Sequence, residues 1–345
     1  MFDRVADLPL VVEDYTMSAA TLETSSDFTR VSTTVGLSGE GETGRGEDVG
    51  YDADDQRRFQ DAYGDGGLDL GGEYTLASFS SRLDDLDLFP APATREHDRH
   101  YRRWGLESAA LDLALRQADT DLASALGRSY DPVRFVVSTR LESPTRLDDL
   151  RAVHPDAEFK LDPTDDWDDA LVEAVADRGG VRVLDLKGQY EGTSVDGSVD
   201  PDLYRRVVEA FPDAVIEDPA WTDATRPVLE PARDRIAWDA PITGLASVHE
   251  RPFEPAWLNI KPSRFGTVES LLETIDHCET NDISMYGGGQ FELGGGRGQI
   301  QALASLFYPN APNDVAPGGY NAADLPDDLP TSPLGPPSAP SGYRW

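Results

Sequence analysis

Five charged residues stand at or near the ends of short, strand-like runs in the second half of the chain. They are Lys160 in EFKLD, Asp185 in VLDLK, Glu217 in VIEDP, Asp239 in IAWDA and Lys261 in NIKPS. Their separations are 25, 32, 22 and 22 residues, so each falls about one strand-and-helix unit after the last. At the C-terminal ends of parallel strands, such side chains meet on one face of the sheet.

Three converging carboxylates repel one another unless a cation neutralises them. Oxygen ligands of this kind favour Mg²⁺, with Mn²⁺ as the alternative. We therefore predict that Asp185, Glu217 and Asp239 bind one divalent metal ion. The alternative is that each acid caps the helix that follows it, because a chain with 64 Asp and Glu residues contains coincidences.

The elements that must position these residues begin near residue 132. Short apolar runs alternate there with acidic amphipathic segments, and the runs are VRFVVSTRL, AEFKLD, VRVLDLKG, DAVIEDP, RIAWDAP, WLNIKP and ISMYGGG. Strands interleaved with helices predict a parallel sheet, and seven or eight such units favour a closed (β/α) barrel of the TIM type. An open doubly wound sheet is the alternative.

The first part of the chain has a different hydrophobic pattern. Residues 8–51 predict two strands followed by a glycine-rich loop, GEGETGRGEDVGY. Residues 101–127 predict an amphipathic helical region that closes on Gly127. The last stretch, LPDDLPTSPLGPPSAPSGYRW, is too rich in proline for a helix or a central strand, so we expect an extended tail on the surface.

The net charge of −34 narrows the classes of function and the environment. It excludes nucleic acid as a partner, since phosphate recognition depends on basic patches. The acids are spread along the whole chain, which favours a salt-adapted cytoplasm where ions screen their repulsion. Acidic disorder is the alternative, but 39% hydrophobic residues can sustain a core.

Cys278 is the single cysteine, and we find no signal-peptide or membrane-spanning run. We expect a cytoplasmic protein.

The ordered series of Asp, Glu and Asp between two lysines resembles the enolase superfamily. The closer resemblance is to its muconate-lactonizing-enzyme-like subgroup, which includes o-succinylbenzoate synthases and N-acylamino acid racemases. Three further segments resemble the helix pair before the family's barrel, its seventh-strand region and its capping domain, namely ESAALDLALRQADTDLASALG, MYGGGQFELGGGRGQIQALASLFYPNAPND and GEGETGRGEDVGY.

The resemblance implies a domain plan and a set of roles. It implies an α+β capping domain over residues 1–100, a barrel over 101–322 and the Pro-rich tail over 323–345. Metal binding falls to the three acids already named, and Lys160 and Lys261 face each other across the substrate as base and opposite-face partner, in an order that stays open. Two departures stand out: Glu158 lies where the subgroup has the first lysine of Lys-x-Lys, and Lys187 lies where Asn is common.

The chemistry implied is removal of a proton α to a carboxylate. A metal on both carboxylate oxygens stabilises the enediolate, and a lysine in a dry, cationic pocket can serve as base. Elimination, as in o-succinylbenzoate synthase-like dehydration, and racemisation or epimerisation both remain open. The alternative is a catalytically silent metal-binding barrel that acts as a binding or scaffold protein.

Three more residues are candidates for contact with a small-molecule carboxylate: Glu292, Arg297 and Lys187. Arg297 could hold a distal carboxylate by a bidentate contact. The alternatives are that Glu292 and Arg297 pair with each other and that Lys187 pairs with Asp218 or Glu191. We expect capping-domain loops within residues 16–29 and 39–51 to select the substrate, and we leave homo-oligomerisation open.

Overall fold

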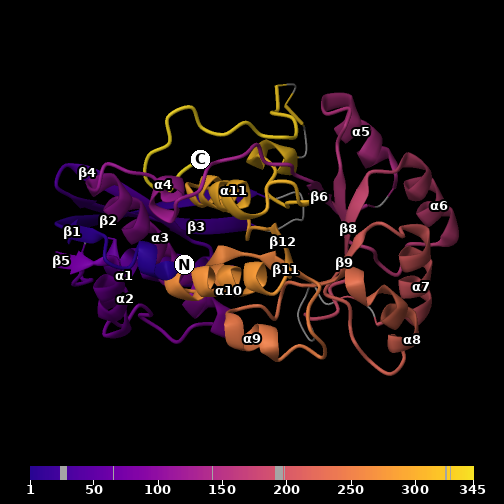
Figure 1. Cartoon of the computed structure of the whole chain (residues 1–345), viewed down its shortest axis with the longest axis horizontal. Helices are drawn as coiled ribbons and strands as arrows, with labels where there is room; N and C mark the ends of the chain where they lie inside the picture. The colour runs from indigo at the N-terminus through magenta and orange to yellow at the C-terminus, as the bar shows by residue number, and fades with distance from the viewer. Residues whose placement is uncertain are drawn as a thin grey trace.

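The computed structural model describes residues 1–23, 29–64, 66–141, 143–190, 197, 199–322, 325–326 and 328–345. An N-terminal part built on antiparallel strands lies beside a C-terminal part built on parallel strands (Figure 1). Within the described residues, no helix is both long enough and apolar enough to cross a membrane.

The N-terminal part is a cap made of a three-stranded antiparallel sheet, a two-stranded ribbon and helices. The sheet contains β2 (Asp14–Glu23), β3 (Thr29–Gly39) and β4 (Glu42–Asp48), and the ribbon pairs β1 (Pro9–Val12) with β5 (Gly72–Thr75). The helices are η1 (Phe2–Arg4), α1 (Ala53–Tyr63), α2 (Leu76–Asp84), α3 (Glu96–Gln117) and α4 (Leu122–Leu126). Gly127 ends α4 in a left-handed conformation, as the sequence predicts.

The predicted glycine-rich loop is wrong, because most of that segment is the strand β4. Gly41 lies in the turn between β3 and β4 with a φ of 82°, but the glycines within β4 permit close packing rather than a turn. A Cβ on Gly44 would lie 2.2 Å from the carbonyl oxygen of Ala109, and one on Gly46 would lie 2.1 Å from that of Gly105. β4 can therefore press directly against the backbone of α3. The segments expected to be substrate loops are also largely strand, and residues 24–28 lie outside the described residues.

The helix α3 belongs physically with the cap. It packs along β4 and β3, and it buries Trp104, Leu106 and Leu113. The boundary predicted at residue 100 falls inside this helix. We propose that the cap continues to the end of α4 at Leu126.

The C-terminal part contains all seven predicted strands. They are β6 (Val137–Thr139), β7 (Phe159–Leu161), β8 (Val181–Asp185), β9 (Val215–Glu217), β10 (Ile236–Trp238), β11 (Trp257–Ile260) and β12 (Ser284–Gly287). The helical connections are α5 (Thr145–Val153), α6 (Asp169–Arg178), α7 (Pro201–Ala210), α8 (Arg226–Leu229), η2 (Glu230–Arg235), α9 (Leu245–His249), η3 (Pro262–Arg264), α10 (Val268–Thr280), α11 (Gly296–Phe307) and η4 (Gly318–Asn321). All neighbouring strands are parallel and follow chain order.

A short segment at Asn313 and Asp314 joins the two outer strands. The N–H of Val136, just before β6, donates to the carbonyl of Asn313 at 2.8 Å, and the N–H of Asp314 donates to the carbonyl of Gly287 in β12 at 2.8 Å. The sheet is thus closed, with this segment in place of an eighth strand. The predicted barrel with an N-terminal cap is confirmed, and the open-sheet alternative is wrong.

The C-terminal segment crosses from the barrel back to the cap. Leu334 pairs with Val133 and Gly342 pairs with Asp121. Tyr343 is fully buried, and its ring meets Trp104 edge-on at a centroid distance of 6.5 Å. The segment is extended, as its prolines predict, but its end is packed into the cap rather than lying on the surface.

Candidate active site

The three predicted metal ligands end adjacent strands and point into the same mouth. Asp185 and Glu217 are the last residues of β8 and β9 and are register partners, and Asp239 follows β10 directly. Each is completely buried. Two residues before each acid stand Val183, Val215 and Ala237, which form a buried apolar cluster with Tyr286. Because side chains alternate along a strand, this apolar layer and the acids share the inner face, one above the other.

Lys160 holds several of these carboxylates together. It extends from the middle of β7, and its Nζ lies 2.6 Å from Oε2 and 2.7 Å from Oε1 of Glu217. The same ammonium lies 3.4 Å from Asp185 and 3.6 Å from Asp314. With its side chain only 2% exposed, Lys160 is an enclosed cation among three acids.

Lys261 follows β11 and pairs with Asp239 instead. Its Nζ donates to Oδ2 of Asp239 at 2.9 Å, and Nη1 of Arg264 lies 3.0 Å from Oδ1 of the same carboxylate. The hydroxyl of Tyr190 also donates to Oδ2, at 3.0 Å. Arg264 and Tyr190 are site residues that the sequence reasoning missed.

Lys187 is the third lysine of the mouth. Its Nζ contacts Oδ2 of Asp185 directly and lies 3.6 Å from Oδ2 of Asp162. It does not pair with Asp218, and Glu191 lies outside the described residues. Lys160, Lys187 and Lys261 are the only lysines in the sequence, and every other basic side chain apart from histidine is arginine.

The remaining contacts fix Glu217 and Asp218. Tyr286 donates its hydroxyl to Oε2 of Glu217 at 2.5 Å, and Asn259 donates to Oε1 at 3.3 Å. Asp218 accepts the N–H groups of Asp239 and Ala240, each at 2.8 Å. Asp218 therefore holds the backbone that presents Asp239.

These carboxylates ionise very differently. Burial, reinforced by Asp185, raises the pKa of the Glu217 carboxyl to about 8, and burial with the charge of Asp239 raises the pKa of Asp218 to about 7. Burial also opposes ionisation of Asp185, but Lys187 and Lys160 outweigh it and lower its pKa to about 2. Burial similarly opposes the charged form of Lys160, yet its carboxylate neighbours raise its pKa above the usual range. Without another cation, the acids compete for too little positive charge.

Within the described part of the barrel mouth, acidic side chains outnumber basic ones. The acids are Asp162, Asp185, Glu217, Asp218, Asp239 and Asp314, and the cations are Lys160, Lys187, Lys261 and Arg264. Six carboxylates thus face four cations. A divalent cation would supply the missing charge, and hard oxygen donors suit Mg²⁺ or Mn²⁺.

The arrangement fits a metal ion by its chemistry but is not a preassembled cage. No group of three His, Cys, Asp or Glu side chains within the described ranges is placed as a metal site. Lysine ammonium groups contact oxygens that an ion would use. Oδ1 of Asp162 nevertheless remains buried without a hydrogen-bond donor. Metal binding therefore requires lysine side chains to give way.

The glycine loop after β12 carries the other predicted substrate residues. Oε2 of Glu292 lies 3.5 Å from Nη2 of Arg297, and Oε1 accepts the N–H of Gln290 at 2.6 Å. The two residues pair with each other, as the alternative interpretation has it. Two residues of the cap hold this loop: Arg30 donates to the carbonyl of Gln290 at 2.9 Å, and Glu47 accepts N–H groups from the loop.

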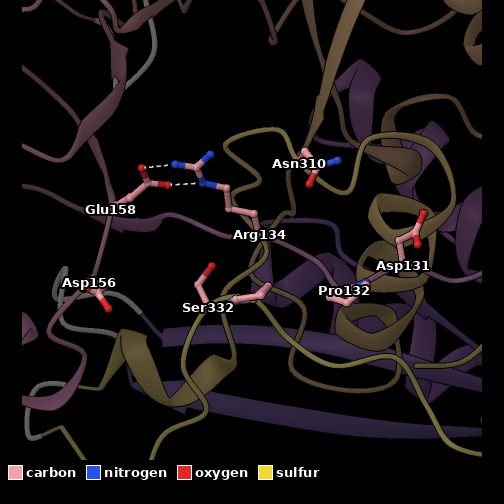
Figure 2. A pocket seen from close by; sticks show the side chains of 8 residues that line it. Asp131, Pro132, Arg134, Asp156, Glu158, Asn310 and Ser332 are labelled. Carbon is pink, nitrogen blue, oxygen red and sulfur yellow. Dashed lines mark hydrogen bonds and ion pairs between the residues drawn. The ribbon is translucent and has the colours of Figure 1, made fainter.

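A separate cavity of about 650 Å³ lies near the starts of the strands rather than their ends (Figure 2). Glu158, one residue before β7, forms a two-armed ion pair with Arg134 there, and Arg182 lies 3.5 Å away. The carboxylate of Glu158 is thus neutralised by arginines. Glu158 makes no ion pair with Lys160. The residue that stands in place of the first lysine of Lys-x-Lys therefore lines this cavity.

A capped barrel of parallel strands with acids at its mouth is the fold of the enolase superfamily. A solved member of that superfamily from Listeria innocua matches with a TM-score of 0.66 and 18% identity, over 92% of this chain and 88% of that one. A dipeptide epimerase from Methylococcus capsulatus, solved in complex with a Mg ion, matches with a TM-score of 0.67 and 18% identity, over 92% of each chain.

Within this fold, the chain belongs to the family described as Domain of unknown function (DUF8230). The family's N-terminal domain matches residues 3–125 and its C-terminal domain matches residues 129–322. The division between the two matches falls just after α4, which agrees with the cap extending to Leu126.

Two relatives also match by sequence. The chain is 27% identical over 243 residues to o-succinylbenzoate synthase of Bacillus subtilis (strain 168), which is 66% of this chain and 62% of the synthase. It is 28% identical over 285 residues to N-succinylamino acid racemase of an Amycolatopsis species, which is 77% of this chain and 73% of the racemase. The first match spans less than two thirds of the synthase.

Proposed function

We propose that this protein catalyses removal of a proton α to the carboxylate of a small molecule, assisted by Mg²⁺ or Mn²⁺. The observation that carries the proposal is the set of three buried acids on adjacent strand ends, with lysines from β7 and after β11 in contact with them. Elimination and racemisation or epimerisation are the outcomes that this chemistry allows.

The roles follow from elementary chemistry. Asp185, Glu217 and Asp239 would hold the metal ion, which lowers the free energy of the enediolate by neutralising its two charged oxygens. Lys160 and Lys261 supply the base and the group on the opposite face. In racemisation one lysine takes the α-proton and the other returns a proton to the same carbon. In elimination a Cα=Cβ double bond forms as the bond to the β-substituent breaks, and the protonated lysine gives its proton to the leaving group, so that a β-hydroxyl departs as water.

The similar proteins support this class of reaction and suggest substrates. One relative is named for racemising N-succinylamino acids, another for forming o-succinylbenzoate, and a structural neighbour for epimerising dipeptides. All three names fit a carboxylate substrate. We therefore propose an acylated amino acid, a dipeptide or a related carboxylate as the substrate.

The test is solvent deuterium uptake at the α-carbon. The protein is incubated in D₂O with Mg²⁺ and panels of N-succinylamino acids, N-acetylamino acids and dipeptides, and the α-proton signal is followed by NMR. We expect exchange with at least one substrate, its loss on chelation by EDTA and its loss in Glu217→Gln. Exchange that persists in EDTA or in Glu217→Gln would contradict the assignment of the acids.

A catalytically silent barrel that serves as a binding protein is the second candidate. It is favoured by the ion pairs that already engage all three acids. Metal binding without exchange on any member of the panels would favour it over an enzyme.

A further inference from the structure

We propose that Lys187 competes with the metal ion for Asp185 and moves to Asp162 when the ion binds. This inference rests on the proposed function, because it assumes that Asp185 is a metal ligand. Lys187 has neither the metal-binding role nor the proton-transfer role in the proposed function. The competition makes Lys187 a tethered cation that sets how tightly the site holds its metal.

Lys187 occupies both oxygens of Asp185. Its backbone N–H donates to Oδ1 at 3.2 Å, and its Nζ contacts Oδ2. The residue has a φ of 55°, a left-handed conformation that is unfavourable for lysine. The chain therefore accepts a strained backbone at the end of β8, and this turn folds the ammonium back onto the carboxylate.

A second acceptor stands ready beside it. Oδ2 of Asp162 lies 3.6 Å from Nζ of Lys187, and Oδ1 of Asp162 is buried without a hydrogen-bond donor. Asp162 directly follows β7, whose register pairs Leu161 with Leu184, so it stands next to Asp185 across the two strands. A small movement of the ammonium group would transfer it from Asp185 to Asp162. Asp185 would then pair with the metal ion, so that neither carboxylate is left without a cation.

Lysine suits this exchange better than arginine. An ammonium is a compact charge on a flexible stem, whereas a guanidinium makes a planar two-armed contact that fixes its partner. The chain uses arginine for all its other basic side chains apart from histidine and keeps lysine at three positions, all in this mouth. The side chain of Lys187 is 25% exposed, against 2% for Lys160 and 9% for Lys261, so Lys187 has room to move.

The test measures metal affinity, not activity. Mn²⁺ binding is followed by electron paramagnetic resonance and Mg²⁺ binding by calorimetry, for the parent protein, Lys187→Met, Asp162→Asn and the double variant. Removing an ammonium in direct contact with a ligand should tighten binding about tenfold or more. Asp162→Asn should weaken binding in the parent, where Lys187 loses its second acceptor, and should weaken it much less once Lys187 is Met.

Controls separate this effect from general electrostatics. Arg297→Met removes a cation paired with Glu292 on the neighbouring loop and should leave metal affinity within about twofold, because its charge does not contact a ligand. Lys187→Gln replaces Lys187→Met if the latter does not fold, and Lys187→Arg should bind metal no more tightly than the parent, because it keeps a cation beside Asp185.

The outcomes distinguish the two proposals. Unchanged or weaker metal binding in Lys187→Met and Lys187→Gln, with a parent that binds metal, overturns the competition and leaves the proposed function standing. Equal effects of Asp162→Asn in both backgrounds overturn the move to Asp162. If neither the parent nor Lys187→Met binds a divalent ion, the proposed function fails, and this inference fails with it.

Discussion

Glu47 of the cap accepts a hydrogen bond of 3.1 Å from the N–H of Gly296, the first residue of α11 in the barrel. The same carboxylate accepts the N–H groups of Leu293 and Gly294 at 2.7 and 2.9 Å and the hydroxyl of Ser32 at 2.6 Å. A carboxylate from one part of the molecule thus satisfies the free N–H groups at the start of a helix in the other. This contact links the cap to the loop that carries Glu292 and Arg297.

The first prediction is that Glu47→Gln loosens the glycine loop. The amide cannot accept at both ends, so at least one buried N–H loses its partner at a cost of roughly 1 to 3 kcal/mol. We expect a lower melting temperature and faster proteolysis within residues 288–296. Glu42→Gln, an exposed position on the same strand, is the matched control and should match the parent. Equal proteolysis of both variants would show that Glu47 does not hold the loop.

The second prediction separates the roles of Lys261 and Lys160. Lys261→Ala should lower turnover by at least ~100-fold, the scale for loss of a positioned acid or base, while the fold and substrate binding survive. Lys160→Ala should lower turnover as much and should also destabilise the fold, because Glu217 loses its closest cation. Turnover on a substrate of the parent and thermal melts measure both effects. Full α-proton exchange in both variants would refute the assignment.

The third prediction concerns salt. The formal net charge of −34 implies strong self-repulsion. At 1 M salt the Debye length is about 3 Å, so this repulsion is largely screened. Thermal melts between 0.2 M and 3 M KCl should show a rising midpoint. A midpoint that stays level across this range would exclude net charge as a determinant of stability.

The barrel could be predicted from sequence because its signals are local. Each strand is a short apolar run, and charged residues stand at or next to the ends of five of them, β7 to β11. Asp185 and Glu217 are examples, since period-two alternation places them above Val183 and Val215 on the inner face. The order of the strands follows from chain order in a barrel.

The sequence-based predictions are wrong or incomplete where the structural role of a residue depends on a partner elsewhere in the fold. Gly44 and Gly46 predict a loop by propensity, but their role is to admit α3, more than fifty residues away. Arg264 and Lys187 gain their roles from carboxylates on other elements or from a left-handed turn. Glu158 is close to Lys160 in the sequence, but in the structure its ion-pair partners are arginines near the starts of the strands.

The fourth prediction is a pH-dependent stabilisation by Asp98→Asn. Asp98 lies in the first turn of α3 and is almost fully buried. Its Oδ2 accepts the N–H of Arg95 at 3.2 Å, and its Oδ1 has no hydrogen-bond partner. Burial, then the charge of Asp48, raises the pKa of Asp98 from 3.8 to about 6, although the N–H and charge of Arg95 oppose this; Asp55 adds a smaller like-charge effect. Between these two pH values the folded state holds a proton that the unfolded chain has released, so stability falls as pH rises and the loss is complete above about pH 6. The loss is at most about 3 kcal/mol.

Asn keeps the acceptor for Arg95 without the charge. The melting temperature of Asp98→Asn minus that of the parent should therefore be larger at pH 8 than at pH 4, at constant high salt. Taking the difference cancels the titration of the other acids, and a difference that does not change with pH would show that Asp98 is ionised normally in the folded protein.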